Sequence, residues 1–381
     1  MHRHIALVAL TASAVAACSP DRGVTDPSLS LAANVAADAG AASGANGPGA
    51  VYALTNQATE NAVAAFTRAA DGTLTAAGTV GTGGKGTGAG LGSQGAVALS
   101  ADGRWLFAVN AGSNDVSVFT VGAAGLSLAG HTGSGGTLPI SLTVHGNVLY
   151  VLNAGGSGNI SGFTVGPTGD LTPIMGSTQS LSGTNVGPAQ VAFSPDGRQL
   201  VVTEKNTSLL DVYAVNAGGA AGGRVTVASA GGTPFGFAFG LRNELFVSEA
   251  AGSASSYVLD ASGNLSLVSG AVPTHRVAPC WAVVTADGRF GYTGNGSGSV
   301  SAFAIAPNGA ASLVDADGGT AVLSGGGVND IALSHNSRYL YVLQTGNPQV
   351  IQAFRVQADG HLIALGPSAG LPAGTRGLAA F

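Results

Sequence analysis

The chain has 381 residues and a net charge of −5, and only 9% of its residues are charged. An average soluble protein has roughly 25% charged residues, and long surface helices depend on them, so this glycine-rich composition favours short strands joined by tight turns. No cluster of Lys or Arg is present, which excludes an electrostatic grip on nucleic acid.

The first residues predict export. Arg3 precedes an apolar stretch over residues 5–17, which is shorter than the roughly 20 residues of a membrane span and has the length of a signal-peptide core. Small residues followed at once by Cys18 resemble the lipobox of bacterial lipoproteins. The alternative is an ordinary cleavage site beside a cysteine. We predict a signal peptide over residues 1–17 and a cell-envelope lipoprotein, on the periplasmic side or the cell surface, which meets the membrane only through lipidated Cys18.

Residues 18–48 predict a flexible tether between this anchor and a folded domain. They are mainly Ala, Gly, Ser, Asn and Asp, without a sustained apolar period. Such a segment cannot bury enough apolar surface to offset the entropy lost on ordering.

From residue 51 onward one pattern recurs. The clearest copies cover residues 96–110 and 190–204, and weaker copies begin at Ser141, Gly236, Trp281 and Asp330. Each has an apolar strand, a turn such as Ala-Asp-Gly or Pro-Asp-Gly, a second apolar strand, a third strand and a weaker fourth. Because Asp-Gly supplies the positive φ values of a tight hairpin, the flanking strands pair antiparallel. Each copy therefore predicts a four-stranded antiparallel sheet.

One apolar position of the first strand marks every copy: Val97, Leu142, Val191, Phe237, Ala282, Ile331 and Leu378. The spacing is about 47 residues, within the roughly 40 to 50 residues of a propeller repeat. The last copy, residues 377–381, is a first strand alone, and the first copy, residues 51–92, lacks its first strand. We predict an all-β, seven-bladed propeller over residues 49–381, closed as a monomer by the C-terminal strand joining the first blade.

The end of every second strand carries an amide or a carboxylate, at Asn56, Asn110, Asn153, Glu204, Glu249, Asn295 and Gln344. These ends share one face of a propeller with the starts of the first strands. An Asn there commonly bonds to its own turn, which is the structural alternative for the amides. Glu is a poor turn residue, and Glu204 and Glu249 lie in neighbouring blades. Two carboxylates in one pocket suit acid–base catalysis; the alternative is two solvated acids on a rim.

The starts of the first strands add Gln94, Gln190, Trp281, Asp330 and Arg376, and the loop before the sixth blade adds His275 and Arg276. Acids, an Arg and a His around one channel can attack a carbonyl, or hold a sugar or carboxylate without reacting. We predict Glu204, Glu249, His275 and Arg276 as the catalytic candidates. The predicted ligand-binding residues are Gln94, Asn110, Asn153, Gln190, Trp281, Asn295, Asp330, Gln344 and Arg376. No histidine spacing is typical of a metal site, so neither metal nor cofactor is predicted.

Two segments carry a family resemblance. Residues 193–202, Phe-Ser-Pro-Asp-Gly-Arg-Gln-Leu-Val-Val, and residues 149–153, Leu-Tyr-Val-Leu-Asn, resemble lactonase-type propellers and the YVTN-type repeats of surface-layer proteins. The lactonase group includes bacterial 6-phosphogluconolactonase and the fungal carboxymuconate lactonizing enzyme. The resemblance covers residues from about 50 to 381 and implies a seven-bladed propeller.

The resemblance also implies a catalytic set: an Arg-His pair after Gly-Pro, and a Glu after the Asn that ends the next strand. In this chain Gly187-Pro188 is followed by Ala189-Gln190, and Lys205 stands where the Glu would be. Glu204 occupies the Asn position, and a shift of one residue turns a side chain to the other face of a strand.

Two functions follow as hypotheses. The first is a propeller that binds a small molecule, glycan or protein at its central-channel face, without the family's Arg-His pair. The alternative is a hydrolase of a sugar lactone or carboxylated lactone, which would use Glu204, Glu249, His275 and Arg276 in a rearranged site.

Overall fold

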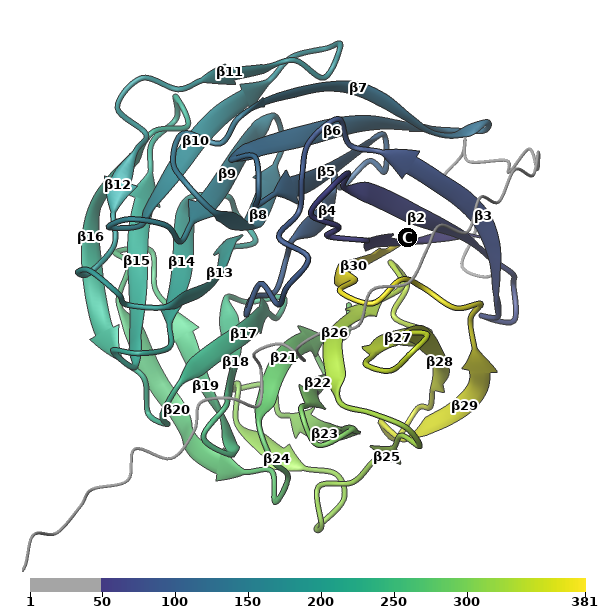
Figure 1. The fold of residues 1–381 in the computed structure, drawn as a ribbon. Coiled ribbons are helices and arrows are strands. Elements are labelled where there is room, and N and C mark those ends of the chain that lie inside the picture. Colours follow the sequence, from purple (N-terminus) through teal and green to yellow (C-terminus); the bar gives the residue numbers. More distant parts are fainter. Residues whose placement is uncertain (1–48) are drawn as a thin grey trace, which may run out of the picture.

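The computed structural model describes residues 49–381. The predicted signal peptide, Cys18 and the tether lie outside the described residues, so those predictions stay untested. The described residues form seven antiparallel sheets around a central axis (Figure 1). The predicted all-β, seven-bladed propeller is therefore confirmed. No helix within residues 49–381 has the length and hydrophobicity needed to cross a membrane.

The strands are numbered along the chain. Blade 1 contains β30 (Arg376–Ala380), β1 (Gly49–Leu54), β2 (Ala62–Arg68) and β3 (Leu74–Gly81). Blade 2 contains β4 (Val97–Leu99), β5 (Trp105–Asn110), β6 (Asp115–Gly122) and β7 (Gly125–Gly133). Blade 3 contains β8 (Pro139–His145), β9 (Val148–Asn153), β10 (Asn159–Val165), β11 (Leu171–Pro173) and β12 (Gln179–Ser180).

Blade 4 contains β13 (Pro188–Phe193), β14 (Gln199–Glu204), β15 (Leu209–Val215) and β16 (Ala221–Ala228). Blade 5 contains β17 (Pro234–Phe239), β18 (Glu244–Glu249), β19 (Ser253–Leu259) and β20 (Leu265–Pro273). Blade 6 contains β21 (Pro279–Val284), β22 (Phe290–Asn295), β23 (Ser299–Ile305), β24 (Ala311–Leu313) and β25 (Ala321–Val322). Blade 7 contains β26 (Val328–Leu333), β27 (Tyr339–Gln344), β28 (Val350–Val356) and β29 (Leu362–Pro367). In blades 3 and 6 the outer strand is split into two short pieces, which the repeat pattern did not predict.

The predicted hairpin turns are stabilised by one repeated set of contacts. In blade 2 the Ser100 hydroxyl donates to Asp102 at 2.6 Å, and the same carboxylate accepts the Arg104 N–H at 3.1 Å. Gly103 follows with a φ of 67°, which a side chain would disfavour. The same arrangement recurs at Ser194 and Asp196 in blade 4. Local sequence therefore determines these reversals.

The ring closes as predicted, because β30 pairs antiparallel with β1. Val51 lies opposite Ala380, and the Phe381 N–H donates to the Ala50 carbonyl at 2.8 Å. A third contact comes from the neighbouring blade, where the buried Asp330 carboxylate accepts the Leu378 N–H at 2.9 Å. The last strand of the chain thus pairs with β1 along one edge, and Asp330 of blade 7 holds it at Leu378.

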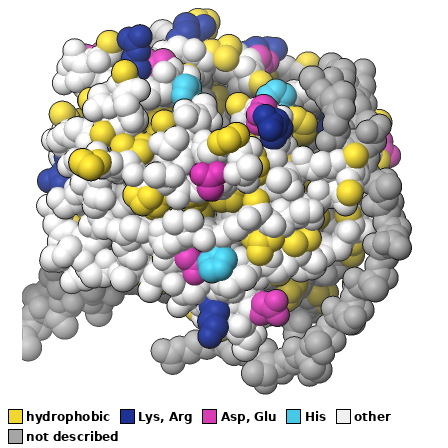
Figure 2. Space-filling model, turned by 90° about the horizontal axis from the view of Figure 1, so that it is seen from above, with side chains coloured by type: hydrophobic (Ala, Val, Ile, Leu, Met, Phe, Trp, Pro, Cys, Tyr) yellow, Lys and Arg dark blue, Asp and Glu magenta, His cyan; other side chains and the backbone are white. Residues whose placement is uncertain are grey.

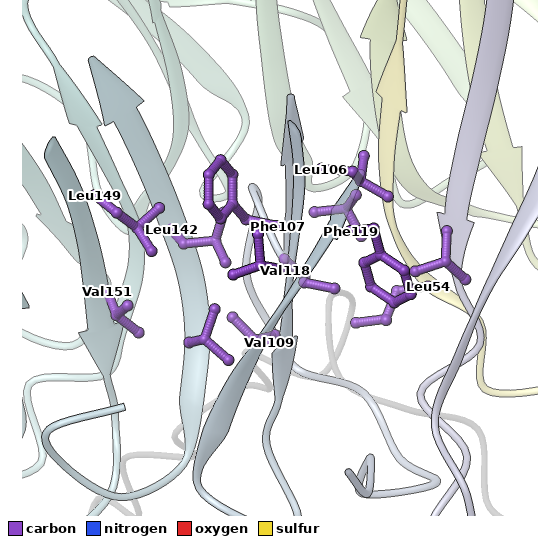
Figure 3. Packing of buried hydrophobic residues seen from close by; sticks show 14 of the residues in the cluster. Leu54, Leu106, Phe107, Val109, Val118, Phe119, Leu142, Leu149 and Val151 are labelled. Atoms are coloured by element: carbon purple, nitrogen blue, oxygen red, sulfur yellow. The ribbon is translucent and has the colours of Figure 1, made fainter. Parts of the chain in front are cut away.

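Apolar side chains fill the spaces between blades. Figure 3 shows one such cluster, in which Leu54 of blade 1, Phe107 and Phe119 of blade 2, and Leu142 of blade 3 lie together. Each sheet is therefore buried on both faces by its neighbours, which is why a single blade would not be stable alone. The face seen in Figure 2 carries few charged side chains, some of which lie together in small groups of opposite charge.

Candidate functional site

The seven residues that end the second strands are all buried. Asn56, Asn110, Asn153, Glu204, Glu249, Asn295 and Gln344 are each no more than 2% exposed. Most bind the third strand of their own blade, the loop that enters the blade, or both. Asn295, for example, donates to Ser299 at 3.0 Å and to Ser301 at 2.9 Å. These contacts favour the structural alternative for the amides, although their predicted role in ligand binding stays a prediction.

Glu249 is surrounded by donors from its own blade and the loop that enters it. Its Oε1 accepts hydrogen bonds from Ser229 (3.0 Å), the Gly231 N–H (2.7 Å) and Ser255 (2.6 Å). Its Oε2 accepts from Ser253 at 2.5 Å. Four hydrogen bonds compensate the burial of this carboxylate. Glu249 therefore links the loop that enters blade 5 to the sheet of that blade.

Glu204 has a comparable set of donors in blade 4. Oε1 accepts the Ser182 N–H at 2.9 Å, and Oε2 accepts the hydroxyls of Ser182 and Thr207, the latter at 2.7 Å. No hydrogen bond or ion pair within residues 49–381 joins Glu204 to Glu249. The alternative of two solvated rim acids is wrong, since both side chains are fully buried.

A different carboxyl group is influenced by Glu204. Asp211 in β15 is fully buried. Its Oδ1 accepts the Thr226 hydroxyl at 2.6 Å and lies 3.4 Å from Arg224 Nε, whereas its Oδ2 has no donor in the described chain. Desolvation, together with the neighbouring Glu204 carboxylate, raises the pKa of Asp211 to about 7.

His275 and Arg276 lie on the loop between β20 and β21. His275 is exposed and has a φ of 55°. Arg276 pairs with Asp317, with 2.7 Å between Nη2 and Oδ2, across to the outer loop of blade 6. Within residues 49–381, neither His275 nor Arg276 forms a hydrogen bond or ion pair with Glu204 or Glu249, so their predicted catalytic roles stay predictions.

The connection between β3 and β4 reaches across the middle of the ring (Figure 1). We call residues 89–95 the crossing segment. Its Ser93 hydroxyl donates to the Ile140 carbonyl of blade 3 at 2.8 Å, and the Gln94 N–H donates to the Ala189 carbonyl of blade 4 at 3.1 Å. Gly92 and Gly95 have φ values of 60° and 80°, which glycine adopts without strain. The segment ties together blades that are not neighbours.

Three of the predicted ligand-binding residues form these links. The Gln94 side chain bonds both the carbonyl (2.8 Å) and the N–H (2.9 Å) of Ala282 in blade 6. Trp281 Nε1 donates to the Ser93 carbonyl at 3.1 Å. The Gln190 side chain bonds Phe237 of blade 5 in the same two-point manner, at 3.0 and 2.8 Å. All three side chains are therefore engaged by main-chain groups around the channel.

The first strands of blades 4 and 5 explain why Gln94 crosses the ring. Gln190 stands one residue before the apolar position of β13 and bonds the equivalent apolar residue, Phe237, in the next blade. The corresponding residue of blade 5 is Gly236, which has no side chain for this purpose. A Cβ there would lie 2.0 Å from Gln94 Oε1. Gln94 thus occupies the place that a blade 5 glutamine would take.

Asp330 and Arg376 lie at the junction of the two chain ends. Asp330 accepts the N–H groups of Ile331 (2.8 Å) and Leu378 (2.9 Å), and its complete burial raises the pKa of its carboxyl well above the usual range. Arg376 is half-buried, and its Nη1 donates to the Thr375 carbonyl at 2.7 Å. These contacts belong to ring closure, and a ligand-binding role stays a prediction for both.

Lys205 was not among the predicted site residues, yet it is the cation nearest the crossing segment. Its Nζ donates to the Gly92 carbonyl and lies 5.0 Å from the centre of the Phe235 ring. Desolvation lowers the pKa of Lys205 to about 8. A lysine directly after an apolar strand that leads to the channel face was the available sequence signal. For Asp211 it was an acid within the apolar run Leu-Leu-Asp-Val-Tyr.

In this chain, the positions of the Arg-His pair and the Glu implied by the resemblance are occupied by residues that make structural contacts. Ala189 is fully buried, Gln190 bonds the main chain of Phe237, and Lys205 bonds Gly92. Within residues 49–381, no three His, Cys, Asp or Glu side chains gather as a group of metal ligands.

Comparisons with known proteins agree with this architecture. Residues 51–186 match the family described as lactonase, 7-bladed beta-propeller. A candidate 6-phosphogluconolactonase from Bacteroides fragilis has a similar structure, with a TM-score of 0.72 and 20% identity over 88% of this chain and 98% of that chain. The periplasmic gluconolactonase PpgL of Pseudomonas aeruginosa gives a TM-score of 0.69 and 17% identity, over 87% and 98%. Among curated protein sequences, none matches this chain.

At these identities the solved structures show a common fold, and the family match adds the sequence pattern of residues 51–186. The resemblance found in the repeats is therefore confirmed over residues 51–186, and the described chain is a seven-bladed β-propeller.

Proposed function

We propose that this chain is an exported binding propeller that takes a small, uncharged or weakly charged molecule at the mouth of its channel, beside the crossing segment. One observation carries the proposal. The residues at the family's Arg-His positions are committed to packing, because Ala189 is fully buried and both polar atoms of Gln190 bond Phe237. The remaining residues at the channel mouth are better suited to binding a ligand than to catalysing its hydrolysis.

The surroundings of the crossing segment indicate the kind of ligand. The polar groups that meet there are mostly main-chain amides and carbonyls, together with glutamine and serine side chains and the Trp281 Nε1–H. Lys205 is the one cation bonded to the segment within the described residues. Such a surface suits a small polar molecule more than a large polyanion.

Lactone hydrolysis is the alternative, and the family match favours it. It would use Glu204, Glu249, His275 and Arg276. His275 is exposed, so a His275→Ala variant removes a candidate acid or base without opening the core. Glu60→Gln, at an exposed acid of the loop between β1 and β2, is the matched control.

The experiment combines two measurements on the purified protein with sugar δ-lactones and their hydrolysed acids. Proton release in a pH-stat measures turnover, and the shift of the unfolding midpoint measures binding. We expect a midpoint shift for at least one compound without turnover above the buffer rate. Turnover that is lost in His275→Ala or Glu204→Gln and kept in Glu60→Gln would instead support the hydrolase.

Export and lipid anchoring form part of the same proposal, on the basis of residues 1–18. The weakly charged surface of the propeller is compatible with a function outside the cytoplasm. Membrane attachment through Cys18 would keep the domain near the envelope while the channel mouth stays accessible to small molecules.

A further inference from the structure

Lys205 stands apart from the other cations of the channel face because of where its amine is placed. Its N–H donates to the Gly187 carbonyl at 3.0 Å, which holds the backbone against the start of blade 4. Its side chain then reaches the crossing segment and bonds the Gly92 carbonyl. The amine therefore has a defined position at the mouth of the channel.

The surroundings of this amine are apolar and uncharged. The Phe235 ring covers one side at 5.0 Å, and Trp281 packs against Phe235 with 5.5 Å between ring centroids. Lys205 forms no ion pair with any described carboxylate. The Phe235 ring and the Gly92 carbonyl favour the charged form, but the loss of hydration on burial, without a counter-ion, favours the neutral amine. Burial lowers the pKa of Lys205 to about 8, so that about a quarter of the amine is neutral at pH 7.5.

We propose that Lys205 is a nucleophilic amine that takes a small aldehyde or ketone at the channel mouth as a reversible imine. The neutral Nζ forms a bond to the carbonyl carbon, and the carbonyl oxygen takes up a proton to give a carbinolamine. Loss of this oxygen as water, with the second proton of the amine, leaves a carbon–nitrogen double bond. Addition of water reverses each step, so no oxidant or further reactant is needed.

A carbonyl compound fits this site better than an anion does. The described groups that bond the crossing segment are neutral apart from Lys205, so no second cation is present to share a carboxylate or a phosphate. Lys205 and the Phe235 ring are held in place by contacts within the protein. This inference rests on the proposed function, because it places a small ligand at the same mouth.

The chain supplies its own control for the test, since its two lysines are Lys85 and Lys205. Lys85 is exposed on the same connection between β3 and β4. Its main-chain N–H donates to the Ser113 hydroxyl at 2.8 Å, and its side chain forms no hydrogen bond or ion pair with the described residues. Both amines therefore meet a reagent in one sample of correctly folded protein.

The experiment treats the mature protein with glycolaldehyde and cyanoborohydride, which reduces each imine to a stable secondary amine. Peptide mapping by mass spectrometry then gives the rate at each lysine and at the chain terminus. At pH 7.5 we expect Lys205 to react at least fivefold faster than Lys85. The rate at Lys205 should level off above about pH 8, whereas that of an ordinary lysine rises up to about pH 10.

Lys205→Arg keeps the charge and should lose the fast reaction, and Lys85→Arg should keep it. Equal rates at the two lysines, or a slower rate at Lys205, would overturn the inference. If Lys205 is labelled rapidly and saturably but no sugar lactone or acid shifts the unfolding midpoint, the imine inference stands and the proposed binding of sugar lactones or acids is contradicted. If these compounds shift the midpoint but Lys205 is unreactive, the proposed binding stands and the imine inference is contradicted.

Discussion

Replacing Asp211 with asparagine is expected to stabilise the propeller at alkaline pH and to leave its stability at acid pH nearly unchanged. Asp211 is fully buried, and desolvation together with the neighbouring Glu204 carboxylate favours its protonated form. In Asp211→Asn, the side chain is neutral at every pH, whereas the wild-type carboxyl must take up a proton to become neutral. Thr226 can still donate to the remaining oxygen, as it does now at 2.6 Å.

The magnitude follows from the raised pKa. The folded state holds the Asp211 proton up to about pH 7, whereas the unfolded chain releases it near the ordinary aspartate pKa of 3.8. Wild-type stability should therefore be highest below about pH 4 with respect to this group, fall as the pH rises to about 7, and stay low above it. The full shift corresponds to about 4 kcal/mol. Because asparagine gives up the ion pair with Arg224, we expect a net gain of about 2 kcal/mol at pH 8.

Denaturation by urea at pH 4, 6 and 8 measures this difference between wild type and variant. Its dependence on pH isolates Asp211, since every other group is common to both proteins. Thr226→Val is a useful companion, because it removes a donor to Asp211 and should lower stability at pH 8. A variant that is less stable than wild type at pH 8, or a difference that is independent of pH, would refute the interpretation that burial raises the pKa of Asp211.

Three further predictions concern the ring and the anchor. Deletion of residues 376–381 should lower the unfolding midpoint and promote association, measured by light scattering, because β1 loses its partner strand; an unchanged midpoint and a monomeric deletion variant would contradict closure by β30. Gly236→Ala should cost about 1–3 kcal/mol in unfolding free energy by denaturant titration, since its Cβ would meet Gln94 Oε1 at 2.0 Å and the Cys280 carbonyl at 2.7 Å; no loss would show that the crossing segment yields freely. Cys18→Ser should remove the lipid mass from the mature protein and release it from the membrane fraction, whereas wild-type protein with Cys18 joined to Cys280 by a disulfide would contradict lipidation.

Much of the architecture followed from local pattern. The apolar positions from Val97 to Leu378 recur at a propeller spacing, and the Asp-Gly turns determine antiparallel hairpins between them. The incomplete first and last copies predicted the closing pair β1 and β30, and the structure confirms it. These features depend on short-range periodicity and turn chemistry, which a single sequence carries.

The candidate site was less predictable. Six of the seven second strands end on an amide or an acid, and Asn56 follows the end of β1 by two residues. Burial, however, makes Glu204 and Glu249 hydrogen-bonded links between loop and sheet within separate blades. The contacts that decide this come from Ser182, Ser229 and Gly231, in loops whose sequences have no repeat. Side-chain direction and loop path depend on distant packing, so no local pattern predicts them.

The number of blades, the order of strands within each blade and the pairing of the chain ends could all be predicted from repeat spacing and turn residues, because these act over short distances. The occupant of the channel could not be predicted, because it depends on contacts between distant parts of the chain. The glycine-rich connection between β3 and β4 has no period of its own, and its course depends on the space left by Gly236 and on main-chain groups of blades 3, 4 and 6 that bond Ser93 and Gln94. The placement of Lys205 beside Gly92 and Phe235, and the lowering of its pKa by burial, follow from that course.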